Sequence, residues 1–192
     1  MSPATTPTVQ RHWNRLYWDE IDSPLPELEG SDQTLRLLLV ASDHGLVEIG
    51  FVPAREHDAA IAALATIADE LHHEPAMLSE AARELDEYFA GTRTSFSLPL
   101  DLPADPSFRA TARARLRDIG YGETRTYKEF ATILGRPTAI RAAATACATN
   151  QLPIVVPCHR VVRGDGSLGG YLGGLPAKQF LLELEKKGAR RG

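Results

Sequence analysis

A cysteine and its immediate neighbours carry the clearest sign of chemistry in this chain. The β-branched run Ile154–Val156 leads through Pro157 into Cys158, and His159 and Arg160 follow directly. The run predicts a buried strand that ends at the proline, because proline lacks the backbone N–H that a strand ladder needs. A cysteine attacks as its thiolate, which a nearby base or cation favours. We therefore expect Cys158 to be a nucleophile, with His159 and Arg160 as candidates to activate it.

The same residues also fit a purely structural role. Free cysteine is often a small buried hydrophobe. Neighbours in an extended segment point to opposite sides, so His159 is expected to reach Cys158 only through a turn or a bridging water. The rest of the chain has to decide between the two interpretations.

Composition limits the class of protein. The chain has 192 residues, of which 43% are hydrophobic and 24% charged, which predicts one folded domain or two small ones. No stretch approaches the roughly 20 apolar residues of a membrane-spanning helix. Met1–Gln10 is rich in proline and threonine and lacks the apolar core of a signal peptide. We expect residues 1–10 to be flexible and the protein to be cytoplasmic, with no membrane contact.

The cysteine count argues against a disulfide framework, because Cys147 and Cys158 are the only two in the sequence. A structural zinc site usually needs several cysteines or histidines at short spacings. The one histidine pair, His72-His73, has no cysteine nearby. The sequence therefore predicts neither a metal site nor a cofactor.

The net charge of −4 hides an asymmetry between the two halves. Residues 104–192 hold 15 Lys and Arg against 7 Asp and Glu, whereas residues 1–103 hold 6 against 18. A basic half suggests contact with a polyanion, and chance clustering on a solvated surface is the alternative. We place an N-terminal domain with its linker at 11–103 and a C-terminal domain at 104–192.

The first half has the pattern of a small sheet with helices. Strands are expected at 13–21, 35–41 and 46–51, and helices at 56–71 and 77–89. The pair His72-His73 is assigned to the first helical run. Residues 95–106 contain three prolines and predict a linker with a short strand.

Helix signals resume in the second half, at 107–119. Thr126 and Glu129 have the spacing of a capping box, which predicts a helix that continues to Leu134. A Gly-Arg-Pro turn follows, and Thr138 can cap a second helix that ends near Thr149. Helix, short turn and helix form the helix-turn-helix pattern.

The second of these helices has two distinct faces. Periodicity turns one stripe inward: Ile140, Ala143, Ala144 and Cys147. The other stripe carries small side chains and one long cation: Arg141, Thr145 and Ala148. Small side chains allow close approach to a groove, and one arginine can then reach into a base stack. Ordinary packing of an alanine-rich helix is the alternative.

Three further features follow Cys158. Residues 161–163 predict a strand, and residues 169–174 form a glycine-rich loop without the Lys-Ser/Thr of a phosphate loop. A final helix is expected at 176–187. It carries Glu185 close to its C-terminus. A negative charge there interacts mildly unfavourably with the helix dipole, so the presence of Glu185 calls for a role other than helix stability.

Taken together, these motifs resemble the O6-alkylguanine-DNA alkyltransferases, also called methylated-DNA–protein-cysteine methyltransferases. The resemblance covers about residues 105–187. It rests on these motifs in order: Tyr121-Gly-Glu-Thr, Thr126-Tyr127, Arg141, Asn150, Pro157-Cys158-His159-Arg160-Val161, Tyr171-Leu-Gly-Gly and Leu-Leu-Glu-Leu-Glu185. It implies an α/β, ribonuclease-H-like N-terminal domain joined to a mainly α-helical, winged helix-turn-helix C-terminal domain.

The resemblance also implies catalytic roles. Cys158 is the expected alkyl acceptor, and a bound water, His159 and Glu185 form the expected relay to it. Asn150 braces the active-site turn. Tyr127 donates a hydrogen bond to the flipped guanine.

The implied partner is double-stranded DNA that contains O6-alkylguanine, with O4-alkylthymine as a second candidate substrate, bound through the minor groove by a monomer. Arg141 fills the gap of the extruded nucleotide, with Ala142 and Thr145 also on the DNA-binding helix. The expected base pocket comprises Tyr171, Leu172, Gly173 and Cys147. A thioether product cannot be cleaved by such a site, so each molecule is expected to act once, as a suicide enzyme in direct-reversal DNA repair.

Several positions depart from the family pattern. Arg113 stands where tryptophan is usual, and Gln151 stands where proline follows the asparagine. Ile140 is bulkier than the usual alanine, Ala144 replaces a glycine, and Leu172 replaces serine or glycine. Periodicity turns Cys147 toward the core, whereas the resemblance places it on the pocket wall, and both interpretations stay open.

Two other functions compete. A winged-helix DNA-binding protein that senses lesions or regulates genes would explain the helix-turn-helix, although alkyltransferase-like sensors lack the acceptor cysteine. A cysteine hydrolase would use Cys158 and His159, but such enzymes usually take their histidine from a distant part of the chain.

Overall fold

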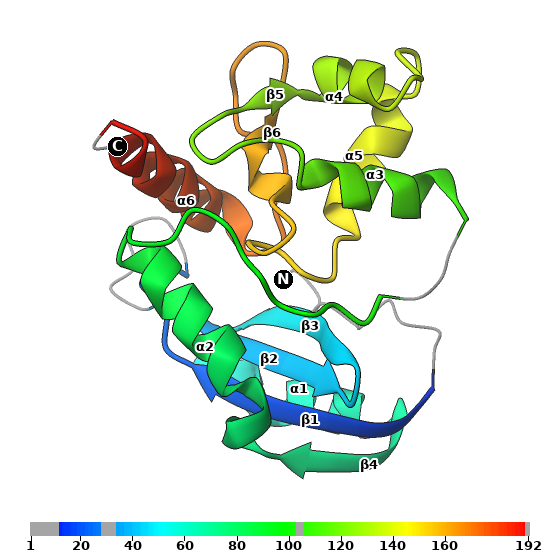
Figure 1. Cartoon of the computed structure of the whole chain (residues 1–192), viewed down its shortest axis with the longest axis vertical. Coiled ribbons are helices and arrows are strands. Elements are labelled where there is room, and N and C mark those ends of the chain that lie inside the picture. The colour runs from blue at the N-terminus through cyan, green and yellow to red at the C-terminus, as the bar shows by residue number, and fades with distance from the viewer. Residues whose placement is uncertain (1–11, 28–33, 103–105, 191–192) are drawn as a thin grey trace. The chain divides into compact units, whose positions relative to one another are not determined.

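The computed structural model describes residues 12–27, 34–102 and 106–190. The chain divides into two compact units, Met1–Pro103 and Ala104–Gly192 (Figure 1). The segment 1–10, for which the sequence predicts flexibility, lies outside the described residues. Within the described ranges, no helix has both the length and the apolar character needed to cross a bilayer.

The first unit is built on a four-stranded sheet with the strand order β3-β2-β1-β4. Its strands are β1 (Trp13–Ile21), β2 (Arg36–Ser42), β3 (Gly45–Val52) and β4 (Ala68–His73). Strands β1 and β2 and strands β2 and β3 pair antiparallel, whereas β4 pairs parallel to β1. The three strands predicted from the sequence are confirmed, with bounds that differ by one residue at most.

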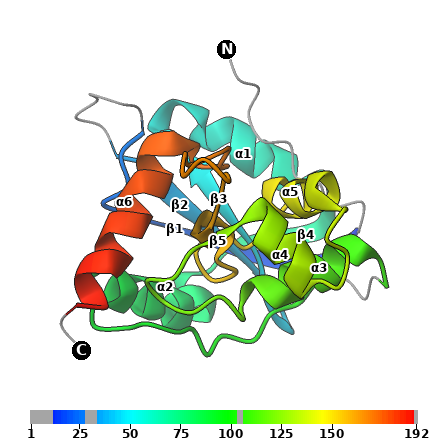
Figure 2. The same cartoon turned by 90° about the horizontal axis from the view of Figure 1, so that it is seen from above.

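Helices α1 (His57–Leu64) and α2 (Pro75–Phe89) lie on opposite faces of this sheet, and a short 3-10 turn, η1 (Ala54–Glu56), precedes α1 (Figures 1 and 2). One hydrophobic core cluster contains Leu64 of α1 together with Leu38 and Val40 of β2. Alternate residues of a strand point to opposite faces, so the equally buried Leu37 and Leu39 face the other layer. The predicted linker makes one isolated bridge to β3, between Leu46 and Leu100.

The helix predicted at 56–71 is wrong in its second half. The chain leaves α1 after Leu64 through a turn in which Ile67 N donates to Leu64 O at 3.0 Å. It then runs as β4 beside β1, with Leu16 paired to Leu71. The alanine-rich run suits a helix by propensity, but pairing with an existing strand overrides propensity here.

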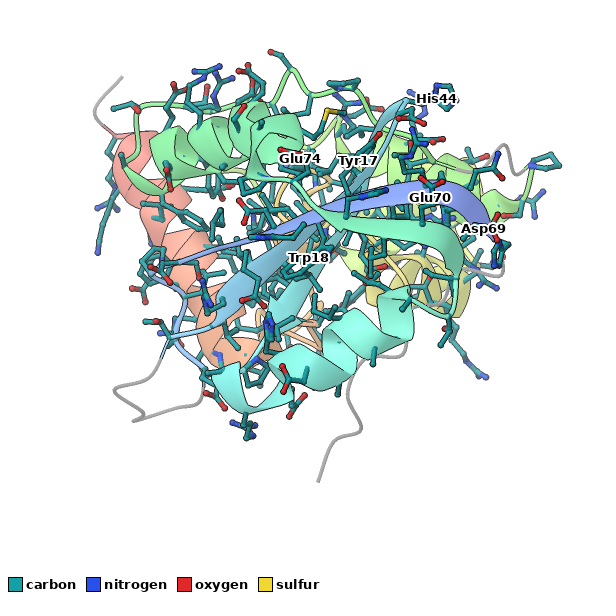
Figure 3. The ribbon with its side chains drawn as sticks, turned by 90° about the horizontal axis from the view of Figure 1, so that it is seen from below. Tyr17, Trp18, His44, Asp69, Glu70 and Glu74 are labelled. Atoms are coloured by element: carbon teal, nitrogen blue, oxygen red, sulfur yellow. The ribbon has the colours of Figure 1, made fainter. Side chains whose placement is uncertain are left out.

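His72 and His73 consequently lie on a strand and not on a helix. Strand β4 places His72 opposite Tyr17 and His73 opposite Trp18 of β1, and Figure 3 labels the two β1 residues. The His73 ring lies 4.4 Å from the Trp18 ring, between centroids, and the His72 ring lies 6.0 Å from the Tyr17 ring. The histidine pair therefore packs across two strands. Among the described residues, no group of three or more His, Cys, Asp or Glu side chains is arranged to hold a metal ion.

The second unit contains short helices and a two-stranded parallel pair. Its elements are α3 (Phe108–Leu116), β5 (Arg125–Thr126), α4 (Tyr127–Ile133), α5 (Ile140–Ala148), the 3-10 turn η2 (Cys158–Arg160), β6 (Val161–Val162) and α6 (Gly174–Gly188). Helix α5 packs against both α3 and α4, and Figure 2 shows the three together. Strand β5 pairs with β6, so the residues just after Cys158 lie beside the start of α4.

The capping box at the start of α4 is confirmed. The Thr126 hydroxyl accepts from Glu129 N at 3.2 Å, and the Glu129 carboxylate accepts from Thr126 N at 2.7 Å. The cap predicted at Thr138 is wrong, because α5 begins at Ile140 and its N-cap residue, Ala139, makes no side-chain bond. Ile140 was expected to face inward, but it is 39% exposed.

Candidate active site

Cys158 lies at the start of a 3-10 turn and not at the end of a strand. Residues 151–156 form bends and turns, with Ile154 at a φ of 74°. Val156 N donates to Leu152 O at 2.7 Å, which closes the loop instead of offering N–H groups to a sheet. The predicted strand at 154–156 is therefore wrong. Its apolar residues are buried as expected, but they support a tight loop that places Cys158, 3% exposed, inside the unit.

Asn150 holds this loop from within. Its buried side-chain amide donates to Val156 O at 2.7 Å and to the Cys158 sulfur at 3.2 Å. Its carbonyl oxygen accepts from Leu152 N at 3.2 Å. One side chain thus fixes both ends of the loop and also contacts the sulfur of the candidate nucleophile.

Two positions that depart from the family pattern meet beside Asn150. The Arg113 guanidinium on α3 donates to Thr149 O at 3.4 Å and to the Gln151 side chain at 3.5 Å. The departures at Arg113 and Gln151 are therefore in contact, and together they tie α3 to the start of the active-site loop.

His159 and Glu185 form a buried pair, with 3.0 Å between His159 Nε2 and Glu185 Oε1. Arg160 Nη2 donates to the same oxygen at 2.8 Å, and Gly122 N donates to the other at 3.0 Å. Gly122 has a φ of 76°, and a Cβ there would lie 2.7 Å from the Ala189 side chain. The glycine is therefore required for this approach to α6.

Burial, His159 and Arg160 together set the charge state of this cluster. Burial acts to raise the pKa of Glu185, but hydrogen bonds and charges from His159 and Arg160 outweigh it and lower the pKa to about 2. Burial lowers the pKa of His159, and the Glu185 carboxylate offsets this only in part. Glu185 is thus an anion paired with the Arg160 cation, and burial leaves His159 neutral and able to accept a proton.

The two buried cysteines are both protonated at neutral pH. Burial raises the pKa of Cys158 to about 11, although the hydrogen bond from Asn150 acts to lower it. Burial also raises the pKa of Cys147 to about 12, and the neighbouring Cys158 adds to this. Cys147 is therefore buried in its helix, as periodicity predicts, and it lies close enough to Cys158 for the ionisation of one thiol to affect the other.

Tyr127, the first residue of α4, lies against the glycine-rich loop. A Cβ at Gly169 would lie 3.1 Å from the Tyr127 hydroxyl oxygen, so the missing side chain permits this contact. Burial raises the pKa of Tyr127 to about 12, and Cys147 and Cys158 contribute to the rise. The hydroxyl thus keeps its proton at neutral pH and can act as a hydrogen-bond donor.

Of the loop residues expected to line a base pocket, Tyr171 contacts the buried cluster. The ring of Tyr171 packs edge-on to His159, with 6.3 Å between centroids. Leu172 is half-buried, and Gly173 is the buried N-cap residue of α6.

The residues expected to contact DNA lie on the exposed face of α5 and do not join the cysteine cluster. Arg141, Ala142 and Thr145 are all exposed. The Thr145 hydroxyl donates to Arg141 O at 3.0 Å within the helix. Arg141 is the long cation of that face, as predicted.

Sequence reasoning missed Lys178 on α6, which is fully buried. It named Arg160 as a candidate to activate the thiol, but the Arg160 guanidinium pairs with Glu185. A signal was present in the helix period, because Lys178, Leu181 and Glu185 are spaced i, i+3, i+7 and share one buried stripe.

Family models of known proteins match both units of the chain. A family model described as "6-O-methylguanine DNA methyltransferase, DNA binding domain" matches residues 107–187. A second, described as "6-O-methylguanine DNA methyltransferase, ribonuclease-like domain", matches residues 36–102. The chain belongs to the 6-O-methylguanine DNA methyltransferase family.

Relatives of this methyltransferase family align over most of the chain. It is 37% identical to a methylated-DNA–protein-cysteine methyltransferase of Methanosarcina barkeri, over 91% of this chain and 100% of the relative. It is 38% identical to the constitutive enzyme of that name from Bacillus subtilis, over 88% of this chain and 95% of the relative. Among solved structures, Mycobacterium tuberculosis OGT in complex with DNA has a TM-score of 0.70 and 34% identity, over 91% and 94% of the two chains.

Proposed function

We propose that this protein repairs DNA by direct reversal, moving the alkyl group of O6-alkylguanine in double-stranded DNA irreversibly onto Cys158. The observation that carries the proposal is the environment of the Cys158 sulfur. It accepts a hydrogen bond from Asn150 and is followed by a neutral His159 held on an ionised Glu185. A nucleophile, a base and a group that orients the base form the pattern of an activated thiol.

The transfer begins with loss of the thiol proton, since the thiol is protonated at neutral pH. His159 Nδ1 is buried and has no hydrogen-bond partner among the described residues, and a bridging water is the partner that fits such an atom. His159 accepts the proton through this water. The thiolate then attacks the alkyl carbon, the C–S bond forms, and the C–O6 bond breaks. The displaced guanine takes up the proton, so the products are a thioether and guanine.

Tyr127 stabilises the leaving base. Its hydroxyl keeps its proton at neutral pH and can donate to the guanine as negative charge develops there. Cys147, Tyr171, Leu172 and Gly173 line the pocket around the base. A thioether cannot be cleaved by any group of this site, so each molecule acts once.

DNA is bound through helices α4 and α5, which act as a winged helix-turn-helix on the minor groove, with the N-terminal unit as the ribonuclease-H-like domain. The target base must leave the stack, at a cost of a few kcal/mol. Arg141 on the exposed face of α5 occupies the gap, and Ala142 and Thr145 permit close approach. The protein acts as a monomer.

The test is intact-mass spectrometry after incubation with a duplex that contains one O6-methylguanine. We expect a single gain of about 14 Da in the wild type and in Cys147→Ala, and none in Cys158→Ala. A gain in Cys158→Ala would assign the acceptor elsewhere. Tight binding of the lesion without any mass change would favour the alternative, a protein that senses lesions without repairing them.

A further inference from the structure

Ile140 is a branched apolar side chain that the structure leaves on the surface, directly before Arg141. It is the first residue of α5 and is 39% exposed. It stands where the family pattern usually has alanine, so its size is a feature of this chain. A single exposed apolar side chain needs no explanation by itself. The surroundings of Ile140 on α5 have to show whether it has a role.

Ile140 begins a stripe of α5 that leads from the surface to the buried cysteines. Residues at i, i+4 and i+7 share one side of an α-helix, which places Ile140, Ala144 and Cys147 in line. Exposure falls along this line from Ile140, through the half-buried Ala144, to 7% at Cys147. Cys147 lies close enough to Cys158 for the two thiols to interact. Ile140 is therefore at the outer end of the side of α5 that leads to the nucleophile, about 10 Å from Cys147 along the helix axis.

Arg141 lies beside Ile140 on the exposed face of the same helix. Successive residues of an α-helix are turned by about 100°, so Arg141 and Thr145 occupy the middle of this face and Ile140 occupies its edge. That edge is the one next to the Cys147 stripe. When Arg141 fills the gap in a base stack, Ile140 thus lies between the gap and the nucleophile, against the nucleotide next to the extruded one.

The charges near Ile140 favour a polyanion as the surface that covers it. Residues 127–149 hold three basic side chains and one acidic side chain. The acid, Glu129, is engaged in the capping box of α4. The three cations are all exposed: Lys128, Arg136 and Arg141. An apolar side chain among cations matches a DNA groove, where phosphates attract the cations and an apolar residue can enter a base step.

We propose that Ile140 is an apolar wedge that enters the minor groove beside Arg141 and lowers the cost of extruding the alkylated base from a duplex. Isoleucine is among the side chains that proteins insert between base steps, which partly unstacks them. Contact with the nucleotide next to the gap removes the Ile140 side chain from water and so stabilises the opened stack. The inference rests on the proposed function and adds a determinant of substrate form, because a single strand has no paired stack to open.

The test compares single-turnover transfer from O6-methylguanine in a duplex with transfer from the same oligonucleotide as a single strand. We expect Ile140→Ala to slow transfer from the duplex by about 10-fold and to change the rate with the single strand by less than about 2-fold. Ile140→Leu keeps the apolar volume and should retain most of the duplex rate. Ile133→Ala is the matched control, because Ile133 is 47% exposed on α4, and it should change neither rate.

A second measurement reports the unstacking directly. A 2-aminopurine placed next to the lesion gains fluorescence when it loses its stacking partner. In a Cys158→Ala background, where no transfer follows binding, we expect this gain to be smaller with Ile140→Ala at saturating protein.

Three results would overturn the proposal. They are an unchanged duplex rate in Ile140→Ala, a loss of the same size with the single strand, and an equal loss in Ile133→Ala. A wild-type protein that gains no mass from either form of the substrate would instead refute the proposed function. Normal transfer by the wild type together with an unchanged duplex rate in Ile140→Ala would refute the role of Ile140 alone.

Discussion

The imidazole of His159 and the carboxylate of Glu185 are joined at 3.0 Å, and Arg160 shares the same carboxylate oxygen at 2.8 Å. Glu185 lies near the C-terminus of α6, where a negative charge is unfavourable for the helix dipole. The ion pair with Arg160 offsets this unfavourable interaction. Burial lowers the pKa of His159, and Arg160 balances the charge of Glu185, so Glu185 can orient His159 without drawing a proton onto it.

The substitution Glu185→Gln tests how much the buried ion pair between Glu185 and Arg160 contributes to stability. The amide retains the shape of the side chain, but it leaves the buried Arg160 cation without its anion. Breaking a buried ion pair by removing one partner typically costs about 3–5 kcal/mol, so we expect the free energy of unfolding to fall by that order. Urea denaturation at neutral pH measures it.

The matched control is Glu183→Gln, on the exposed face of the same helix. We expect it to change the free energy of unfolding by less than about 0.5 kcal/mol. Equal effects of the two substitutions would show that the buried pair contributes nothing specific.

Asn150→Ala should slow alkyl transfer and also destabilise the loop. The substitution removes the hydrogen bond to the Cys158 sulfur and leaves Val156 O and Leu152 N without this partner. Buried groups left unsatisfied cost about 1–3 kcal/mol. The lost donor also raises the pKa of the thiol, so we expect the pH–rate profile of transfer to move upward. Gln151→Ala, one residue away, should leave the profile in place, and a shift of similar size there would contradict the role of Asn150.

The sequence predicted the members of the candidate site better than their local structure. Cys158, His159 and Glu185 were identified before any coordinates, because their order along the chain matches a known family. The strand expected before Cys158 is instead a loop, since the pattern of apolar residues reports burial and cannot distinguish a strand from a packed turn. Only the three-dimensional contacts of Asn150 and the positive φ of Ile154 reveal the difference.

Two other differences have the same origin in tertiary context. The run from Glu56 to Leu71 has the composition of a helix, yet Ala68–His73 pairs with β1 because that strand offers a free edge. Lys178 was passed over because a lysine on a helix is usually solvated. Its burial depends on two carbonyls from distant segments, and such contacts leave no local pattern.

Arg141→Ala should affect transfer from duplex DNA and not the chemistry at sulfur. Arg141 is exposed on α5 and makes no side-chain bond to the cysteine cluster within the described residues. We expect the rate with an O6-methylguanine duplex to fall by about 10-fold or more, because the gap in the base stack is no longer filled. The rate with a free O6-alkylguanine base should be unchanged. Arg115→Ala serves as the control, because it removes an exposed cation that pairs with Asp118 at 2.9 Å. Equal losses of rate in both variants would show that Arg141 contributes only positive charge and does not fill the gap in the base stack.

Glu48 on β3 gives the N-terminal unit a pH-dependent stability. Burial raises the pKa of Glu48 from its ordinary value of 4.5 to about 7. Below about pH 4.5 the carboxyl is protonated in both the folded and unfolded states, so it has no effect on stability there. Between that value and about pH 7, the unfolded chain ionises while the folded protein holds its proton. Stability therefore decreases as the pH rises through this window, and it stays lower above pH 7.

Glu48→Gln should remove this dependence. The neutral amide carries no ionisation penalty, so the variant should match the wild type near pH 4 and exceed it near pH 8 by at most about 3 kcal/mol. Urea unfolding of both proteins at the two pH values measures the difference, and the acidic pH serves as the internal control. A difference between variant and wild type that is the same at both pH values would show that the substitution acts through packing and that the carboxyl does not titrate in this window.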